Sequence, residues 1–189
     1  MNISPTQASQ VASSSNLSFR RAATADVDTI VALVNSAYRG ESSRAGWTTE
    51  ADLLGGQRTD AEEVSRLIGT DGSVILLCQC GDEIVGSVHL EKVDAATAYL
   101  GMLVIKPVLQ GQGCGSRFMA AAENFVRAEW GVARMQMQVI TLRHELIAYY
   151  QRRGYQRSGE IRPFPVADPK FGLPKVGGLM LEVLEKSLR

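Results

Sequence analysis

The sequence predicts a mixed α/β (α+β) fold, in which a largely antiparallel central sheet of about six to seven strands carries helices on both faces. The first observation is a change of apolar period, from helical spacing near the N-terminus to strand-like alternation in the middle of the chain. The second is the order of the expected elements: a strand, two helices, a three-stranded meander, a helix, a strand, a helix and a final strand pair. With 189 residues the chain can bury one sizeable core, so we expect a single domain at residues 17–189 after a disordered tail at residues 1–16.

The first part of this domain is expected to be mostly helical. Residues 17–20 read as a short strand, and Thr24 is a suitable cap for the helix that follows. The apolar residues of that helix fall at helical spacing, at Val27, Ile30, Val31, Val34 and Tyr38. A polar stretch at residues 39–49 then leads to a short helical piece at residues 50–54.

A second helix and the meander come next. Asp60 and Glu63, three residues apart, resemble a capping box, which predicts a helix that stops at Gly69. Alternating and apolar runs then predict three sequential strands, at residues 74–80, 84–93 and 98–105, the first two joined by a turn at Gly81 and Asp82.

The last third of the chain alternates helices and strands. Pro107 blocks further sheet pairing, and a glycine-rich turn leads into an amphipathic helix that ends at Gly131. The remaining elements are a strand at residues 134–140, a helix at 143–153, a strand beginning at Tyr155, a proline-rich surface loop at 163–174 and a last strand at 179–184.

Composition excludes several classes of partner. The chain has 20 basic and 20 acidic residues, so no broad charge attracts nucleic acid or anionic lipid. No apolar run approaches the roughly 20 residues that a membrane helix needs, and no secretory signal is present, so we expect a cytoplasmic protein. Cys78, Cys80 and Cys114 lack metal-ligand spacing, which favours buried thiols and predicts no metal site. Whether the protein forms a homodimer is left open.

Only the glycine-rich turn, Gln110 to Ser116, indicates chemistry. It lies between a strand and a long helix, where unsatisfied amides and the positive end of the helix dipole bind phosphate. A P-loop is disfavoured because no Gly-Lys-Ser/Thr ending follows. A dinucleotide fold is disfavoured because the turn follows an antiparallel meander. A flexible connector with three glycines by chance is the remaining structural alternative.

At these residues the sequence resembles the GNAT superfamily of N-acetyltransferases. The family signature is Gln or Arg, two residues, Gly, one residue, then Gly or Ala, and it is matched by Gln110, Gly113 and Gly115. Residues 103–107 are similar to the strand-then-proline segment that precedes this signature. The family's Tyr-x-x-x-Gly-aromatic ending is matched by Tyr150, Gly154 and Tyr155. The resemblance extends over about residues 19–186 and implies the GNAT fold.

The resemblance implies acetyl-CoA as co-substrate, bound without a metal. Its pyrophosphate would lie on the turn amides, those of Gly111, Gln112, Gly113, Cys114, Gly115 and Ser116, next to Gln110. Backbone groups of Leu103, Val104 and Ile105 would hold the pantetheine arm and form an oxyanion hole.

The implied reaction transfers the acetyl group to a primary amine by direct attack through a tetrahedral intermediate. Tyr150 would donate a proton to the departing thiolate. No carboxylate lies in residues 98–105, so His89 and Glu91, on one face of their strand, are the candidate bases, acting directly or through water. Arg143 stands where the family often has Asn, a departure at one CoA contact.

The amine itself stays unidentified at this level. Family substrates enter between residues 39–58 and 160–175, where Trp47, Glu50 and Glu160 could frame an amine. Trp47 could equally anchor its loop on the core. The alternative to an enzyme is a non-catalytic acyl-CoA-binding sensor or regulatory module that kept the glycine turn and lost turnover.

Overall fold

The structure, a computed structural model, describes residues 17–46, 48–166 and 172–189. The expected tail at residues 1–16 lies outside the described residues. A seven-stranded sheet has the order β1-β3-β4-β5-β6-β9-β7, and a small second sheet pairs β2 with β8. The strands are β1 (Leu17–Arg21), β2 (Leu54–Gly55), β3 (Ser73–Cys80), β4 (Glu83–Lys92), β5 (Thr97–Ile105), β6 (Arg134–Ile140), β7 (Gln156–Pro163), β8 (Leu173–Pro174) and β9 (Met180–Ser187).

The large sheet is mixed, as predicted. β5 and β6 run parallel, and its other neighbouring strands are antiparallel. The helices are α1 (Val27–Tyr38), α2 (Gly40–Ser43), α3 (Ala61–Gly69), α4 (Cys114–Trp130) and α5 (His144–Gln151). No helix in the described part of the chain has both the length and the apolar content needed to cross a bilayer.

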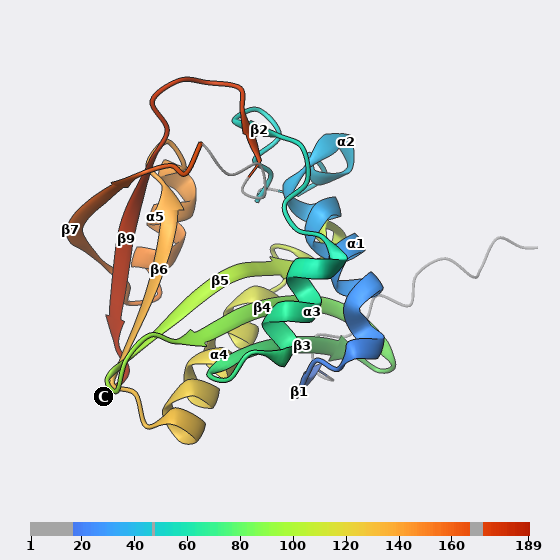
Figure 1. The fold of residues 1–189 in the computed structure, drawn as a ribbon, viewed down its shortest axis with the longest axis vertical. Coiled ribbons are helices and arrows are strands. Elements are labelled where there is room, and N and C mark those ends of the chain that lie inside the picture. The colour runs from blue at the N-terminus through green and yellow to red at the C-terminus, as the bar shows by residue number, and fades with distance from the viewer. Residues whose placement is uncertain (1–16, 47, 167–171) are drawn as a thin grey trace, which may run out of the picture.

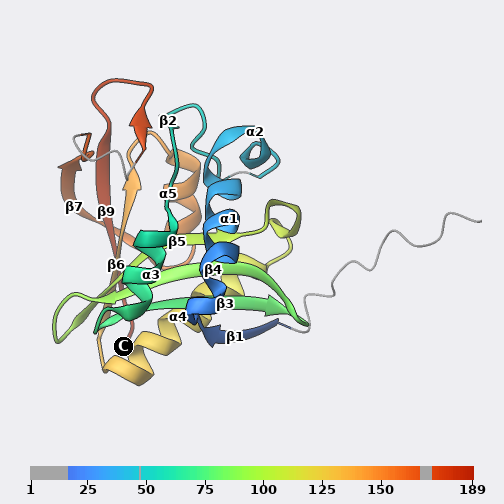
Figure 2. The same cartoon turned by 45° about the vertical axis from the view of Figure 1, so that its right-hand side comes forward.

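Helices cover both faces of the sheet, which confirms the predicted layers (Figures 1 and 2). On one face α1 and α3 pack against β3 and β5, around Ile30, Val34 and Val64. On the other face α4 and α5 pack around Phe118, Met119 and other fully buried side chains. Burying apolar area on both faces is the main stabilising contribution to such a layered fold.

The sheet opens between its two parallel strands. β5 and β6 pair only from Thr97 to Tyr99, with Arg134 to Gln136 as partners, and then diverge. In Figure 1, β6, β9 and β7 run steeply away from β3, β4 and β5. β5 also carries an irregularity, since its register with β4 shifts between Ser87 and His89 and Met102 has a φ of 48°. The divergence leaves one edge of β5 beyond Tyr99 without a strand partner among the described residues.

Two local predictions near the N-terminus are wrong. Thr24 is not a helix cap: it begins a 3-10 turn, Thr24–Asp26, that precedes α1. The carboxylate at this position is Asp26, which accepts the Ala23 amide at 2.8 Å and is held by Arg20. Residues 50–54 form a single turn instead of a helix, because Leu54 passes directly into β2 and pairs with β8.

The predicted cap at Asp60 and the predicted loop at residues 163–174 agree more closely with the structure. Asp60 Oδ1 accepts the Glu63 amide at 2.8 Å, although the Glu63 carboxylate accepts from the Thr59 hydroxyl and so does not complete the capping box. The expected loop at residues 163–174 is shorter than predicted, since β7 extends to Pro163 and β8 includes Leu173 and Pro174.

Candidate active site between the diverging strands

Two cavities open where β5 and β6 separate. The glycine cavity, of about 360 Å³, is lined by the glycine turn, Thr48 and part of α5. The arginine cavity, of about 340 Å³, is lined by the diverging strands, by residues between Tyr38 and Arg58, and by β7 and the segment after it. Leu103, Leu146 and Tyr150 line both cavities. Two molecules that entered from opposite sides, one into each cavity, would therefore meet at these three side chains.

The glycine turn has the backbone that an anion site requires. Gly111 and Gly113 have φ values of 78° and 80°, and a Cβ atom at either position would meet no atom within 4 Å. Glycine is therefore needed at both positions for its backbone conformation and not for lack of space, because residues with a side chain rarely adopt this left-handed region. α4 starts at Cys114, and its N-cap, Gly113, supplies no side-chain cap. The first amides of a 17-residue helix therefore point outward without a capping side chain.

Arg153, which was not predicted from the sequence, places a cation beside these amides. Its Nε and Nη2 donate to the Ser116 hydroxyl at 3.1 and 2.5 Å, and its guanidinium lies 3.4 Å above the Tyr149 ring. Both partners line the glycine cavity, as Arg153 does. Its position directly before Gly154, in the Tyr-x-x-x-Gly ending, was a signal that could have identified it.

Gln110 and Arg143 connect the turn to the segment across the cavity. Gln110 Nε2 donates to the Thr48 hydroxyl and to the Ile105 carbonyl, each at 3.1 Å. Arg143 Nη1 donates to the Thr48 carbonyl at 3.2 Å. Both long side chains thus fix protein segments here.

Some predicted cofactor residues contribute no side chain to the lining. Val104 and Cys114 have buried side chains in the two cores, and Gln112 is exposed. Any contact of Val104 or Cys114 with a cofactor would therefore come from the backbone. Gly115 lines the glycine cavity, where an added Cβ would lie 3.0 Å from Tyr149 Oη.

Tyr150 lies at the junction of the two cavities. α5 carries it, and its ring packs edge-on against Tyr149 and Tyr155, with centroids 5.4 and 5.9 Å away. Burial, followed by nearby Tyr38, raises the pKa of Tyr150 well above its ordinary value. The hydroxyl is therefore protonated at neutral pH, the form that can donate.

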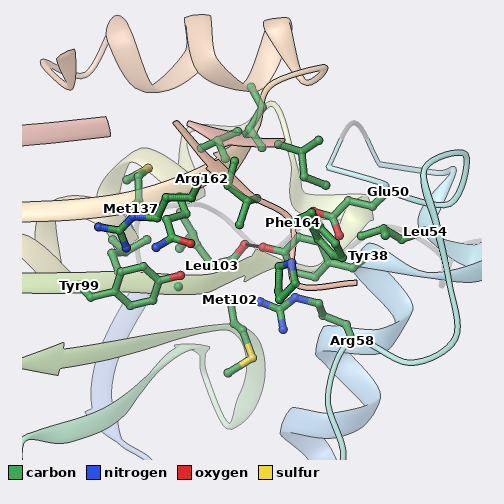
Figure 3. Close-up of a pocket in the computed structure, with 18 of the residues that line it drawn as sticks. Tyr38, Glu50, Leu54, Arg58, Tyr99, Met102, Leu103, Met137, Arg162 and Phe164 are labelled. Carbon is green, nitrogen blue, oxygen red and sulfur yellow. Dashed lines mark hydrogen bonds between the residues drawn. The ribbon is translucent and has the colours of Figure 1, made fainter. Parts of the chain in front are cut away.

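Tyr38 holds the bulged part of β5. Its hydroxyl donates to the Leu103 carbonyl at 2.6 Å (Figure 3), and burial raises its pKa. Together with the Gln110 bond to Ile105, this contact occupies two carbonyls of the segment expected to bind a cofactor arm. A carbonyl oxygen only accepts hydrogen bonds, so an oxyanion at this segment would have to bind to backbone amides.

His89 and Glu91 do not line either cavity. His89 is only 6% exposed and lies 3.0 Å from the Ser73 hydroxyl. That hydroxyl donates to the Leu67 carbonyl, so its oxygen accepts and His89 Nε2 carries the hydrogen. Burial, followed by the charges of Arg66 and Arg58, lowers the His89 pKa to about 4. Glu91 is exposed, opposite Tyr99 in the sheet.

The predicted substrate residues have different positions. Trp47 lies outside the described residues. Glu50 lines the arginine cavity (Figure 3). Its carboxylate bonds to Arg39 and lies 3.9 Å from Arg143. Glu160 is exposed and accepts from Arg162 at 2.6 Å, so it reaches the cavity only through that arginine.

Comparison with known proteins identifies one family. The sequence model of the acetyltransferase (GNAT) family matches residues 31–155. No curated protein matches the chain by sequence. A Salmonella typhimurium protein described as an acetyltransferase, solved with its cofactor acetyl-CoA, has 16% identity and a TM-score of 0.64, covering 92% of this chain and 94% of its own.

Two further solved structures share the fold. The Escherichia coli ribosomal-protein-S18-alanine N-acetyltransferase has 12% identity and a TM-score of 0.66, covering 91% of this chain and 94% of its own. The Vibrio cholerae spermidine/spermine N-acetyltransferase has 13% identity and a TM-score of 0.64, covering 93% and 94%. The substrates in their names, a ribosomal protein and polyamines, differ, so the shared fold alone does not select an acceptor.

Proposed function

The chain belongs to the acetyltransferase (GNAT) family, and from that premise we propose that it transfers the acetyl group of acetyl-CoA to a primary amine. The observation that carries the proposal is the position of Tyr150, whose side chain lines both the glycine cavity and the arginine cavity. In this arrangement the thioester and the amine approach from opposite sides and meet at one protonated hydroxyl.

The glycine cavity suits the cofactor. The pyrophosphate would accept hydrogen bonds from the amides of residues 111–116, and Arg153 would add a positive charge next to them. Amides and a guanidinium already neutralise such an anion, so this site needs no metal. The pantetheine arm would then run along the free edge of β5 toward Leu103 and Tyr150.

The reaction follows from this placement. The nitrogen lone pair attacks the thioester carbonyl, and backbone amides of β5 stabilise the tetrahedral oxyanion. The C–S bond then breaks, and the thiolate leaves beside Tyr150. Because burial raises the Tyr150 pKa, the hydroxyl is a reluctant acid, and a hydrogen bond donated to the developing thiolate is the contribution its environment favours.

The amine must lose a proton before or during attack. His89 and Glu91 remain our candidate bases, and both would act through water. Neither residue lines the arginine cavity. Their partners on β5 do: His89 pairs with Gly101 and Glu91 pairs with Tyr99. Glu50 does line the cavity, but its carboxylate is bonded to Arg39 and lies 3.9 Å from Arg143.

The direct test is thiol release from acetyl-CoA across a panel of amines, with mass spectrometry of the product. Amine-dependent CoA release and an acetylated product would support the proposal. Binding of acetyl-CoA without CoA release under any amine would reject it and favour the non-catalytic acyl-CoA-binding module.

A further inference from the structure

The arginine cavity is positively charged. Its lining includes Arg39, Arg58 and Arg162 but only Glu50 as a carboxylate among the described residues. Glu50 is compensated inside the protein, because Arg39 bonds to it and Arg143 lies 3.9 Å from it. The side chains of Arg39 and Glu50 are only 5% and 14% exposed, so solvent screens this pair weakly. The other cations of the lining are Arg58 and Arg162, and the Arg162 partner, Glu160, lies outside the lining, where the pair is exposed to solvent.

Arg58 and Arg162 come from distant parts of the chain. Arg58 precedes α3 and forms no salt bridge within residues 17–46, 48–166 and 172–189; its guanidinium carbon lies 5.9 Å from the centroid of the Tyr38 ring. Arg162 lies on β7, and its partner Glu160 is an exposed residue outside the lining. Figure 3 shows Arg58 near Tyr38 and Arg162 near Tyr99, at separate places around the same hollow.

The rest of the lining is mostly apolar and the space is small. Leu54, Met102, Met137 and Phe164 line it together with the Leu103 and Leu146 side chains already described. About 340 Å³ is near the lower end of the range for small-molecule pockets. Such a cavity fits one small ligand with an apolar body and an anionic group.

We propose that the acceptor is a small amine that carries a carboxylate, of the amino-acid class with an apolar side chain, and that Arg58 and Arg162 bind this carboxylate. This inference rests on the proposed function, because it is the acetyl transfer beside Tyr150 that would orient the amino group of the ligand toward that residue. The same two cations disfavour the ammonium form of the bound amine, and so help to supply the neutral nucleophile that the reaction needs. A polyamine, with several positive charges, would be repelled.

Binding of product analogues tests the carboxylate without requiring turnover. We would compare N-acetyl-leucine with N-acetyl-leucinamide by calorimetry in the presence of CoA. The carboxylate should bind about tenfold or more tightly, the effect of one charge-assisted hydrogen bond. Arg58→Gln and Arg162→Gln should each reduce that ratio. Arg66→Gln, an exposed change of equal charge that lines neither cavity, should preserve it. Equal binding of acid and amide, or an equal loss in all three variants, would overturn the inference.

Turnover separates this inference from the proposed function. Leucine should be acetylated with a higher kcat/KM than leucinamide, and spermidine should be the poorest of the three. Preferred acetylation of spermidine or leucinamide would overturn the carboxylate assignment and leave the acetyltransferase proposal standing. No acetylation of any amine, combined with tight binding of N-acetyl-leucine, would reject the catalytic proposal and retain the carboxylate site.

Discussion

At the scale of single residues, the chemical role of each side chain in the candidate site depends on the residues that surround it in the folded chain. Tyr150 could be selected from the sequence because it occupies a recognisable ending before Gly154. Arg58 and Arg162 could not, since 104 positions separate them and only the folded chain brings both to one cavity. Glu50 lines the arginine cavity, and its role toward an amine stays a prediction; its two arginine partners, Arg39 and Arg143, could not be predicted because they depend on the folded chain.

Tyr150→Phe removes the hydroxyl and keeps the ring. We expect kcat to fall by about a hundredfold or more, because the loss of one hydrogen-bond donor aimed at a developing anion typically costs about that much, while the affinity for acetyl-CoA stays close to wild type. Steady-state kinetics and calorimetry measure the two quantities. Tyr155→Phe is the matched control, since its hydroxyl bonds to Glu123 at 3.0 Å and lines neither cavity. A Tyr150→Phe enzyme with unchanged kcat would remove Tyr150 from the mechanism.

His89 should make stability depend on pH. Its folded pKa of about 4 lies below the ordinary value of 6.5, so the unfolded chain binds a proton more readily. The stability that this histidine contributes is complete above about pH 6.5 and is lost as pH falls toward 4, by roughly 3 kcal/mol at most. Urea unfolding at several pH values should show a flatter profile for His89→Gln. His144→Gln, at an exposed position at the start of α5, is the control and should unfold with the same profile as wild type. Parallel profiles for wild type and His89→Gln would contradict the assignment.

At the scale of elements, local signals predicted most helices and strands because they act over a few residues. Asp60 does cap α3, and Gly131 ends α4 with a φ of 66°. The prediction for Thr24 was wrong because the nearby Asp26 carboxylate, held by Arg20, accepts the hydrogen bond from the Ala23 amide before α1. β2 and β8 could not be predicted, since each has two residues and exists through pairing with a segment far along the chain.

α4 offers a comparison between its two ends. Gly113 and Gly131 both have left-handed backbones, with φ values of 80° and 66°, and an added Cβ at either would meet nothing within 4 Å. Alanine at either position should therefore cost about 1–2 kcal/mol of strain. Only Gly113→Ala should also weaken acetyl-CoA binding, by about tenfold, because relief of the strain would turn the amides away from the anion. Calorimetry with both variants decides: equal affinities for acetyl-CoA would mean that the turn does not hold the pyrophosphate.

At the scale of the whole molecule, the decisive feature is the opening between β5 and β6. The family resemblance implied free backbone groups at residues 103–105, where the strand splays from its neighbour, whereas apolar periodicity alone cannot show where a sheet parts. The two strands pair at only three positions, Thr97 to Tyr99, and Met102 further along β5 has a φ of 48°. The opening also explains why one molecule has two cavities that share Tyr150. A ligand lying in it would touch α4, α5 and β5 together, and so link both halves of the sheet.

That linkage predicts a cooperative gain in stability with the cofactor. Acetyl-CoA at a hundred times its Kd should stabilise the folded state by about 2.7 kcal/mol, which for a chain of this size raises Tm by roughly 5–10 °C. Free CoA should act similarly, because the phosphate contacts lie on the glycine turn. ATP and NAD also carry phosphates but lack the pantetheine arm that would follow β5 toward Tyr150, so their shifts should be smaller. A melting series with the four ligands tests this directly. No shift with either CoA species, or a larger shift with ATP or NAD, would mean that the glycine turn binds a different cofactor and that the acetyl transfer proposed for this site is wrong.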